Sequence, residues 1–307
     1  MRMTRREFVE SAGATVALAV SGCSFPRGHR DFPCCDYAAL QHEIDEVNPA
    51  DFKAYLEGVE ANRAAFRRLD DAFLKVRDEV TRTVVTDVPA VWLVYNMGIV
   101  VKTRESVFSV DLMHRKAPEF EPLLDFAMIS HNHNDHYTEA FYRAMNGAGK
   151  TVISNFKDNN GAANWRMGGE WWKRGGYTRA VKTFRIKDVE IRTTLTDHNG
   201  YLVDFTTAFE IRCGGYMLYH SGDCCNVGKL NPERQPDLWI VHPYCGMKAD
   251  DGVRKFHPKL TAIAHLNEMG HARDKWRWAY EDGIKAADIV KAAGGKAIVP
   301  TWGARLV

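Results

Sequence analysis

The sequence predicts an α+β protein in which an N-terminal helical segment precedes a mixed array of strands and helices. Two observations support this fold class. From about residue 45 to residue 80, apolar residues recur at three-, four- and seven-residue steps with charges between them, the period of amphipathic helices. From about residue 83, short β-branched runs alternate with turns, and only a few helical stretches separate them.

Length and composition are those of an ordinary globular chain. The 307 residues allow two average domains without requiring them, and 45% of the residues are hydrophobic and 26% charged. This composition excludes collagen, coiled coils and disordered chains. A polytopic membrane protein is also excluded, because no apolar run reaches the ~18 to 20 residues that span a bilayer. The formal net charge is only +2, so bulk charge gives no reason to expect a nucleic-acid partner.

The first residues indicate an export address. Residues 4–9 read Thr-Arg-Arg-Glu-Phe-Val, an apolar stretch covers residues 12–20, and Ser-Gly-Cys ends at Cys23. This pattern resembles a twin-arginine signal peptide, residues 1–22, with a lipoprotein processing site. The resemblance implies export by the twin-arginine route, lipidation of Cys23 and a membrane-anchored lipoprotein on the periplasmic or cell-surface side. An ordinary cleaved signal with a chance cysteine is the alternative.

The residues after the expected signal peptide divide into three segments that differ in their residue patterns. Residues 23–44 are expected to be a tether, residues 45–82 a helical extension packed on the main domain, and residues 83–307 that domain. A partner-binding helix is the alternative for the extension.

Six cysteines remain after Cys23, and six cysteines allow fifteen full pairings. An oxidising compartment permits disulfides, but the spacing is not that of a zinc knuckle. We expect small buried residues or an incidental disulfide, without a catalytic role, for Cys34, Cys35, Cys213, Cys224, Cys225 and Cys245.

The elements of the main domain follow from runs of apolar and β-branched residues between turn signals. Helices are expected at residues 139–145 and 276–293. Strands are expected at residues 91–94, 99–101, 107–110, 126–129, 151–154, 181–184, 189–195, 208–211, 216–220, 238–242, 260–265 and 297–299.

The segment with the clearest chemistry follows the strand at 126–129. It places His131, His133, Asp135 and His136 within six residues, and imidazole and carboxylate are the ligands that zinc takes. His131 and His133 lie two residues apart, so in extended geometry both side chains project to one side. Asp135 and His136 follow in the turn and can face a second ion. One loop therefore begins two neighbouring metal sites.

These residues match the His-x-His-x-Asp-His signature of the metallo-β-lactamase fold superfamily, which the chain resembles from about residue 85 to its end. The resemblance implies a four-layer αβ/βα sandwich. It also implies a third histidine after a later strand, then a bridging aspartate, then a last histidine. His198 in Thr-Asp-His-Asn and Asp223 in Ser-Gly-Asp stand at the first two of these places.

The last histidine has more than one candidate. Two strands end in histidine, at His242 and His265, and the superfamily order of strands favours His265. Through Tyr137-Thr138, the chain resembles most the branch that includes N-acylphosphatidylethanolamine phospholipase D and ascorbate-phosphate lactonase. In that branch, the last histidine often precedes Trp-Gly near the chain end. Here Thr301 stands in that place. Either His265 takes over or the second site is weakened.

Further residues are expected around the ligands. In such folds Asp111, at the end of the strand at 107–110, accepts a hydrogen bond from a metal-bound histidine. Glu268 and His271 either position substrate or lie behind the ligands, or they are polar groups of an exposed turn. The tryptophan-rich residues 164–177 form either a loop that contacts substrate or membrane, or a hairpin corner packed into the core.

The resemblance implies a dinuclear metal-dependent hydrolase. His131, His133 and His198 are expected to bind the first ion, Asp135, His136 and His265 the second, and Asp223 to bridge them. We expect two Zn²⁺ ions per chain, with Mn²⁺ or Fe²⁺ as alternatives. Such a pair holds a hydroxide at neutral pH, which attacks an ester, lactone or phosphodiester of a small molecule or lipid. Asp135 orients this nucleophile and is the expected catalytic residue.

Two other functions remain open for the sequence. The same fold hosts iron enzymes, so a mononuclear iron oxygenase is one alternative, and a surface-tethered binding module with a vestigial site is the other. No Ser-His-Asp elbow, P-loop or dinucleotide-binding glycine motif competes for the chemistry.

Overall fold

The computed structural model describes residues 37–59, 62–156, 182–199 and 202–307. The signal peptide, Cys23, Cys34, Cys35 and residues 164–177 lie outside the described residues. Among those described, no helix is long and apolar enough to cross a membrane.

Three helices precede the first strand: α2 (Tyr37–Asp45), α3 (Pro49–Leu56) and α4 (Ala64–Arg82). Helix α2 thus lies inside the segment expected to be a tether. One face of α4 is apolar and buried, including Phe66, Leu69 and Phe73, and α4 packs on β1. The expected helical extension is therefore covered by, and part of, the main domain.

The first sheet has five strands in sequence order. They are β1 (Ala90–Tyr95), β2 (Gly98–Lys102), β3 (Val107–Val110), β4 (Phe126–Ile129) and β5 (Thr151–Ser154). The first three are antiparallel to one another, whereas β3, β4 and β5 are parallel. The 3-10 helix Ala117–Leu123 precedes β4, and α5 (Glu139–Gly147) packs against that helix and against β5.

The second sheet has seven strands in the order β12-β11-β10-β9-β8-β7-β6. Its antiparallel half consists of β6 (Lys182–Ile186), β7 (Val189–His198), β8 (Leu202–Cys213) and β9 (Tyr216–His220). Its parallel half continues from β9 through β10 (Leu238–Val241), β11 (Thr261–Ile263) and β12 (Ala297–Ile298). Helices α6 (Ala249–Phe256) and α7 (Tyr280–Ala292) contact each other, and α7 contacts β11 and β12.

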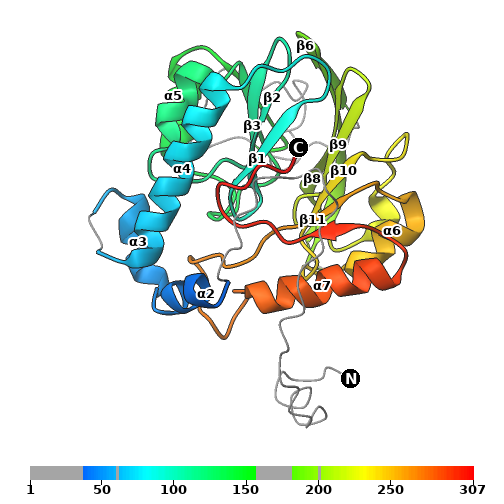
Figure 1. Ribbon diagram of the computed structural model, residues 1–307. Coiled ribbons are helices and arrows are strands. Elements are labelled where there is room, and N and C mark those ends of the chain that lie inside the picture. Colours follow the sequence, from blue (N-terminus) through cyan, green and yellow to red (C-terminus); the bar gives the residue numbers. More distant parts are fainter. Residues whose placement is uncertain (1–36, 60–61, 157–181, 200–201) are drawn as a thin grey trace. The chain divides into compact units, whose positions relative to one another are not determined.

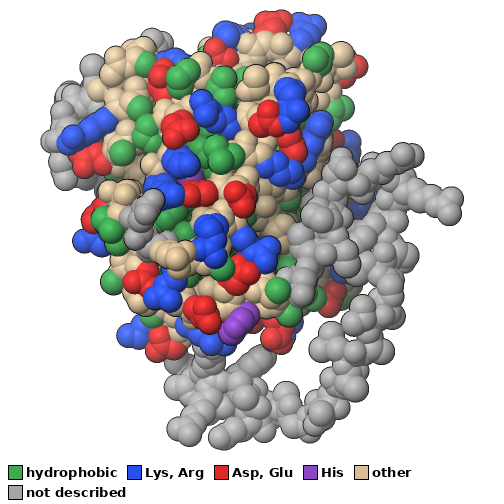
Figure 2. Space-filling model, turned by 60° about the vertical axis from the view of Figure 1, so that its left-hand side comes forward, with side chains coloured by type: hydrophobic (Ala, Val, Ile, Leu, Met, Phe, Trp, Pro, Cys, Tyr) green, Lys and Arg blue, Asp and Glu red, His purple; other side chains and the backbone are tan. Residues whose placement is uncertain are grey.

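The two sheets form the middle layers, with α4 and α5 outside the first sheet and α6 and α7 outside the second (Figure 1). This is the expected four-layer αβ/βα sandwich, the metallo-β-lactamase fold. The C-terminal residues run back along β1, where the Leu93 amide donates to the Ala304 carbonyl and the Leu306 amide to the Val91 carbonyl. Figure 2 shows one face of the molecule, on which acidic and basic side chains are interspersed, as the small net charge suggests.

Two helices differ from the sequence expectation. The helix expected at 276–293 begins at Tyr280, because Trp276 has a φ of 61° and the Asp282 side chain accepts a hydrogen bond from the Ala279 amide, which caps the helix there. Helix α6 was not expected, although acidic residues in its first turn and basic residues in its last are typical helix signals.

Candidate metal centre

The predicted ligands all lie at the carboxyl ends of strands, and these ends meet at one edge of the two sheets. The β4 end supplies His131, His133, Asp135 and His136, the β7 end His198, the β9 end Asp223 and the β11 end His265. The structure therefore brings together, within one site, residues that are far apart in the sequence.

His131, His133 and His198 form the first cluster. One ring nitrogen of each histidine lies within 4.8 Å of the others. Burial and the neighbouring histidines hold the pKa of His131 well below its ordinary value and lower that of His133 to about 4. Both rings are therefore neutral at pH 7, which is the form that binds a metal.

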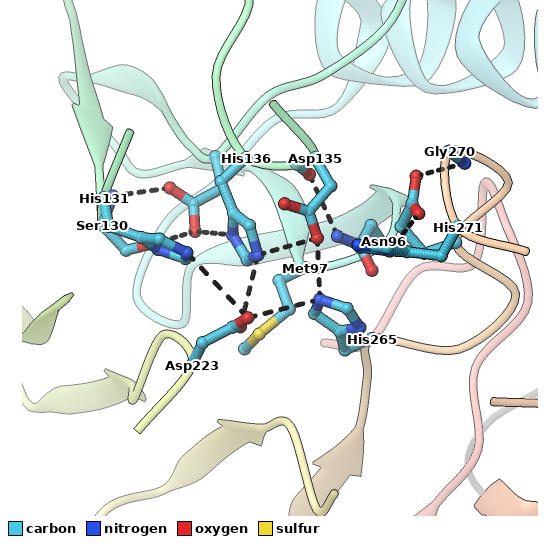
Figure 3. A network of polar contacts seen from close by, with 12 residues as sticks. Asn96, Met97, Ser130, His131, Asp135, His136, Asp223, His265, Gly270 and His271 are labelled. Atoms are coloured by element: carbon cyan, nitrogen blue, oxygen red, sulfur yellow. Dashed lines mark hydrogen bonds and ion pairs between the residues drawn. The ribbon is translucent and has the colours of Figure 1, made fainter. Parts of the chain in front are cut away.

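Asp135, His136, Asp223 and His265 form the second cluster, and all four are buried. His265 Nε2 lies 3.0 Å from Asp135 Oδ2 and 3.4 Å from Asp223 Oδ2, and His136 Nε2 lies 3.2 Å from Asp223 Oδ1. Figure 3 shows Asp223 facing His131, His136 and His265. Asp223 Oδ2 is also 3.4 Å from His198 Nε2, so this carboxylate lies between the two clusters, where a bridging ligand would be.

The charges in the second cluster depend strongly on one another. Burial opposes ionisation of Asp223, but the nearby His136 and His265 hold its pKa well below the ordinary value. Burial likewise opposes protonation of His265, yet Asp223 and Asp135 raise its pKa to about 10. A metal ion would replace the proton between these nitrogens and carboxylates, because it supplies the same positive charge.

The unpartnered atoms of the clusters test whether ions fit. Within the described part of the chain, Nε2 of His131, His136 and His198 and Oδ1 of Asp223 are buried and make no hydrogen bond, although the three nitrogens lie at ion-pair distance from Asp223. Leaving one such atom unpaired costs about 1–3 kcal/mol. Four on adjacent side chains, of the nitrogen and oxygen types that zinc binds, fit a dinuclear metal site.

The opposite ring nitrogens explain why the Nε2 atoms face inward. His136 Nδ1 lies 2.9 Å from Asp111 Oδ2, and Asp111 also accepts hydrogen bonds from the Ser130 amide and hydroxyl, both at 2.7 Å. His131 Nδ1 lies 3.0 Å from the Ser130 hydroxyl. Such contacts fix the ring and leave Nε2 for the metal. Asp111 thus lies where a metal-bound histidine needs its acceptor.

Gly222 permits the turn that presents Asp223. Its φ of +53° lies in the left-handed region, and a Cβ there would come within 2.8 Å of the Thr206 hydroxyl. The Ser-Gly-Asp turn therefore requires glycine at this position.

The two alternative ligands lie outside the clusters. The His242 ring stacks on His265, with ring centroids 3.8 Å apart and an angle of 11° between the planes, so it lies behind His265. His242 belongs to none of the groups of His, Cys, Asp and Glu side chains in the described residues that could hold an ion. The geometry favours His265 as the last ligand.

Glu268 and His271 lie beside the second cluster. His271 Nδ1 is 2.7 Å from Glu268 Oε2, and Glu268 Oε1 accepts hydrogen bonds from the Gly270 amide at 2.7 Å and the Tyr95 hydroxyl at 3.2 Å. The contact with Glu268 raises the pKa of His271. Glu268 is buried and His271 is half-buried, so they are more than polar groups of an exposed turn.

A cavity of about 210 Å³ opens beside the clusters. It is lined by His133, Asp135, His198, Asn199, Asp223, His242, Tyr244, Cys245, His265, His271, Trp276 and Trp278. Tyr244, Cys245, Trp276 and Trp278 were not identified from the sequence. For Tyr244 and Cys245 the signal was available, since they follow β10 at the same sheet edge as the ligands.

Among the cysteines of the described residues, Cys213, Cys224 and Cys245 are free thiols. Cys245 is buried next to the clusters, and its thiol donates to the Asp223 carbonyl at 3.0 Å. Burial raises the pKa of this thiol, which keeps it protonated at neutral pH.

Comparisons with known proteins agree with this architecture. A family model described as a beta-lactamase superfamily domain matches residues 98–242. Igni18, a metallo hydrolase from the archaeon Ignicoccus hospitalis KIN4/I, is 16% identical in sequence, with a TM-score of 0.50 over 71% of this chain and 97% of that one. CmlA, a diiron β-hydroxylase from Streptomyces venezuelae, is also 16% identical, with a TM-score of 0.51 over 72% of this chain and 54% of that one.

At this level of identity, the structural likeness demonstrates a common fold and nothing further. Among curated proteins, none matches the sequence. The family match spans β2 to the end of β10 and includes six of the seven predicted ligands, and the two buried histidine and aspartate clusters are consistent with a binuclear metal site. Residues 98–242 are therefore similar to a beta-lactamase superfamily domain, and the fold carries two buried clusters of residue types that could hold metal ions.

Proposed function

We propose that the protein is an exported dinuclear zinc hydrolase that cleaves an ester, lactone or phosphodiester bond. The observation that carries this proposal is the set of buried, unpartnered Nε2 atoms of His131, His136 and His198 around the Asp223 carboxylate. Zinc suits this site because imidazole nitrogens dominate the ligand set.

The residues of the site have different roles in the proposed reaction. The first cluster would hold one ion and Asp135, His136 and His265 the other, with Asp223 between the two clusters. When bound, two such ions supply a hydroxide at neutral pH and the positive charge that stabilises the oxyanion of an attacked carbonyl or phosphoryl group. Asp111 keeps His136 in the tautomer that presents Nε2 to the site.

Asp135 is placed to orient the attacking oxygen. Its carboxylate lines the cavity and lies 3.0 Å from His265 Nε2, and the Asn96 side-chain amide donates to its backbone carbonyl at 3.0 Å. The carboxylate is thereby fixed from two sides, and it is the acidic group best placed to accept a proton from water entering the cavity.

Export and anchoring are part of the proposal. The paired arginines, the short apolar stretch and Ser-Gly-Cys at residues 21–23 support the twin-arginine route and a lipid anchor on Cys23. In whole cells, Cys23→Ala should release the protein from the membrane fraction, and replacing Arg5 and Arg6 by lysine should block its export.

The relation to the phospholipase D and sugar-lactonase branch is likewise proposed. It is supported by Tyr137-Thr138 after the metal motif and by Trp302-Gly303 near the chain end. It makes phosphodiesters and lactones the first substrates to test.

The deciding experiment combines metal analysis with turnover. Natively purified protein should contain about two transition-metal ions per chain and hydrolyse at least one of a p-nitrophenyl ester, a γ-lactone and bis(p-nitrophenyl) phosphate. Asp135→Ala should abolish hydrolysis in a folded protein, while Asp288→Ala, at an exposed position on α7, should not change it. Less than half an equivalent of any transition metal would contradict the proposal.

The same experiment tests the alternatives. Iron as the bound metal, together with oxygen consumption, would indicate an oxygenase, a class that CmlA represents within this fold. Bound metal without turnover of any substrate class would indicate a tethered binding module.

A further inference from the structure

Three aromatic side chains line the cavity together with the metal clusters. These are Tyr244, Trp276 and Trp278, the aromatic wall, and the remaining lining consists of the histidines, aspartates, one asparagine and one cysteine of the site. No valine, leucine, isoleucine or methionine is among the described residues of this lining. Among the described residues, the apolar lining that a ligand in this cavity meets therefore consists of flat rings.

Two of the three rings form a fixed pair. Tyr244 and Trp278 stack with ring centroids 4.4 Å apart and 21° between their planes. The Tyr244 hydroxyl donates to the Asp282 carbonyl at 2.6 Å, and the Asn267 amide donates to the Trp278 carbonyl at 2.6 Å. Both rings are half-buried, so each keeps surface for a ligand, and their supports keep that surface in place before binding.

The exposure and backbone conformation of Trp276 are not explained by packing. Its side chain is 68% exposed, although large apolar side chains are normally buried. Its φ of 61° is strained for a bulky residue. Its ring stands at 82° to that of His271, with centroids 5.7 Å apart, at the mouth of the cavity. An exposed, strained tryptophan beside a metal site indicates a role in binding.

The size of the cavity limits its occupant. Its volume of about 210 Å³ is below the roughly 300–1,000 Å³ of pockets for drug-sized ligands. A single ring with the bond to be cleaved is small enough, whereas a long acyl chain would extend beyond it.

We infer that Tyr244, Trp276 and Trp278 bind an aromatic ring of the substrate, so that the enzyme acts on small aryl-bearing esters, lactones or phosphodiesters. The inference rests on the proposed hydrolase function and adds the class of substrate. Rings prefer offset-stacked or edge-to-face contacts with other rings, and the wall offers both. The scissile group then lies toward Asp135 and Asp223, which line the same cavity.

The test compares substrates that differ only in ring aromaticity. Zinc-loaded protein is given methyl phenylacetate and methyl cyclohexylacetate, and in parallel benzyl methyl phosphate and cyclohexylmethyl methyl phosphate. Water adds across the cleaved bond and releases methanol and an acid, whose proton is titrated. A third pair, isochroman-3-one and its ring-hydrogenated analogue, covers lactones. We expect kcat/KM to favour the aryl member by about tenfold, the scale of one or two aromatic contacts.

The variants assign the preference to the wall. Trp276→Leu and Trp278→Leu should reduce the aryl preference, the ratio of kcat/KM for the aryl member to that for the cyclohexyl member, to about twofold or less. Trp276→Phe should restore much of the preference. Ile289→Ala, at an exposed apolar position outside the cavity lining, should leave it unchanged.

The outcomes separate this inference from the proposed function. Hydrolysis of both members at equal rates, or faster hydrolysis of the cyclohexyl member, would overturn the aryl preference and leave the hydrolase intact. If no pair is hydrolysed, the hydrolase proposal fails for these bonds. The aromatic site is then tested by calorimetry, which compares the affinity of the protein for phenylacetate with its affinity for cyclohexylacetate. Tighter binding of phenylacetate that is lost in Trp276→Leu would support the aromatic site, whereas equal or absent binding would overturn it.

Discussion

Arg277 joins the N-terminal helices to the loop that bears His271 and Trp276, and we expect its replacement to loosen both. The guanidinium is buried and donates to four backbone carbonyls. Two belong to the helical segment, Ile44 at 3.1 Å and Val47 at 2.7 Å, and two to the loop, Met269 and His271, both at 2.9 Å. Burial lowers the pKa of Arg277, so its desolvation offsets part of this gain.

Arg277→Met keeps the aliphatic length and removes every donor. Each hydrogen bond from a charged group contributes about 1.5–3 kcal/mol net, but the four are not additive, and the freed carbonyls recover some water. Because the four partners are neutral carbonyls, no buried charge is left behind, and we expect the free energy of unfolding to fall by about 2–4 kcal/mol, the scale of one or two such bonds. Urea unfolding of the zinc-loaded protein, followed by circular dichroism, measures it.

Arg273→Met is the matched control, since Arg273 pairs with Asp45 at 2.9 Å and so links the same two segments on the surface. Its side chain is 70% exposed, so the change should cost at most about 1 kcal/mol. If Arg277→Met unfolds at the urea concentration of wild type, or if the Arg273 variant loses as much, the role assigned to the buried guanidinium is wrong.

Three further predictions concern the site and its supports. His265→Ala should lower the metal content from about two ions toward one and reduce turnover by orders of magnitude. His242→Ala should have a milder effect, because the His242 ring stacks on that of His265 and belongs to neither cluster. If metal analysis shows the reverse, the two assignments must be exchanged. Asp111→Ala should weaken metal affinity by about 10- to 100-fold without changing the ligands, because His136 loses the acceptor that orients it, and a chelator competition measures this. The His114 ring stacks on Phe73 and lies 2.7 Å from the Tyr55 hydroxyl and 3.2 Å from Asp70. Burial lowers the pKa of this ring, so the folded state favours its neutral form. This contribution to stability is present above the ordinary pKa of about 6.5 and declines as the pH falls below it. Urea midpoints at pH 7.5 and 5.5 should therefore fall more in wild type than in His114→Gln, and an equal fall in both would refute the assignment.

The sequence alone determined the chemistry of the site and much of the fold. His131, His133, Asp135 and His136 are adjacent in the chain, so the character of a metal motif needs no tertiary information. The strands lie close to the expected ranges, because β-branched runs between turns are a local signal. The places of His198, Asp223 and His265 were implied by the resemblance to the ligand order of the superfamily, because each follows an expected strand in that order.

Strand order already favoured His265 over His242, and only the tertiary structure shows where the two rings lie. Both follow neighbouring parallel strands, β11 and β10, so strand order alone leaves both at the same edge. His265 has a φ of 58°, and its amide donates to the Asn96 carbonyl at 3.2 Å, which places its ring against Asp135 and Asp223. The direction of a side chain after a strand depends on the loop dihedral angles and on the groups that pack around it, and neither has a period in the sequence.

The aromatic wall was beyond the sequence for the same reason. Tyr244 follows β10, whereas Trp276 and Trp278 lie in a stretch that was expected to be helical. That stretch is held open by the strained φ of Trp276 and by Arg277, whose four carbonyl partners come from two distant segments. Hydrophobic periodicity records which residues are buried, but a loop fixed by a buried arginine and backbone carbonyls is specified by contacts that form only when the distant segments have folded together.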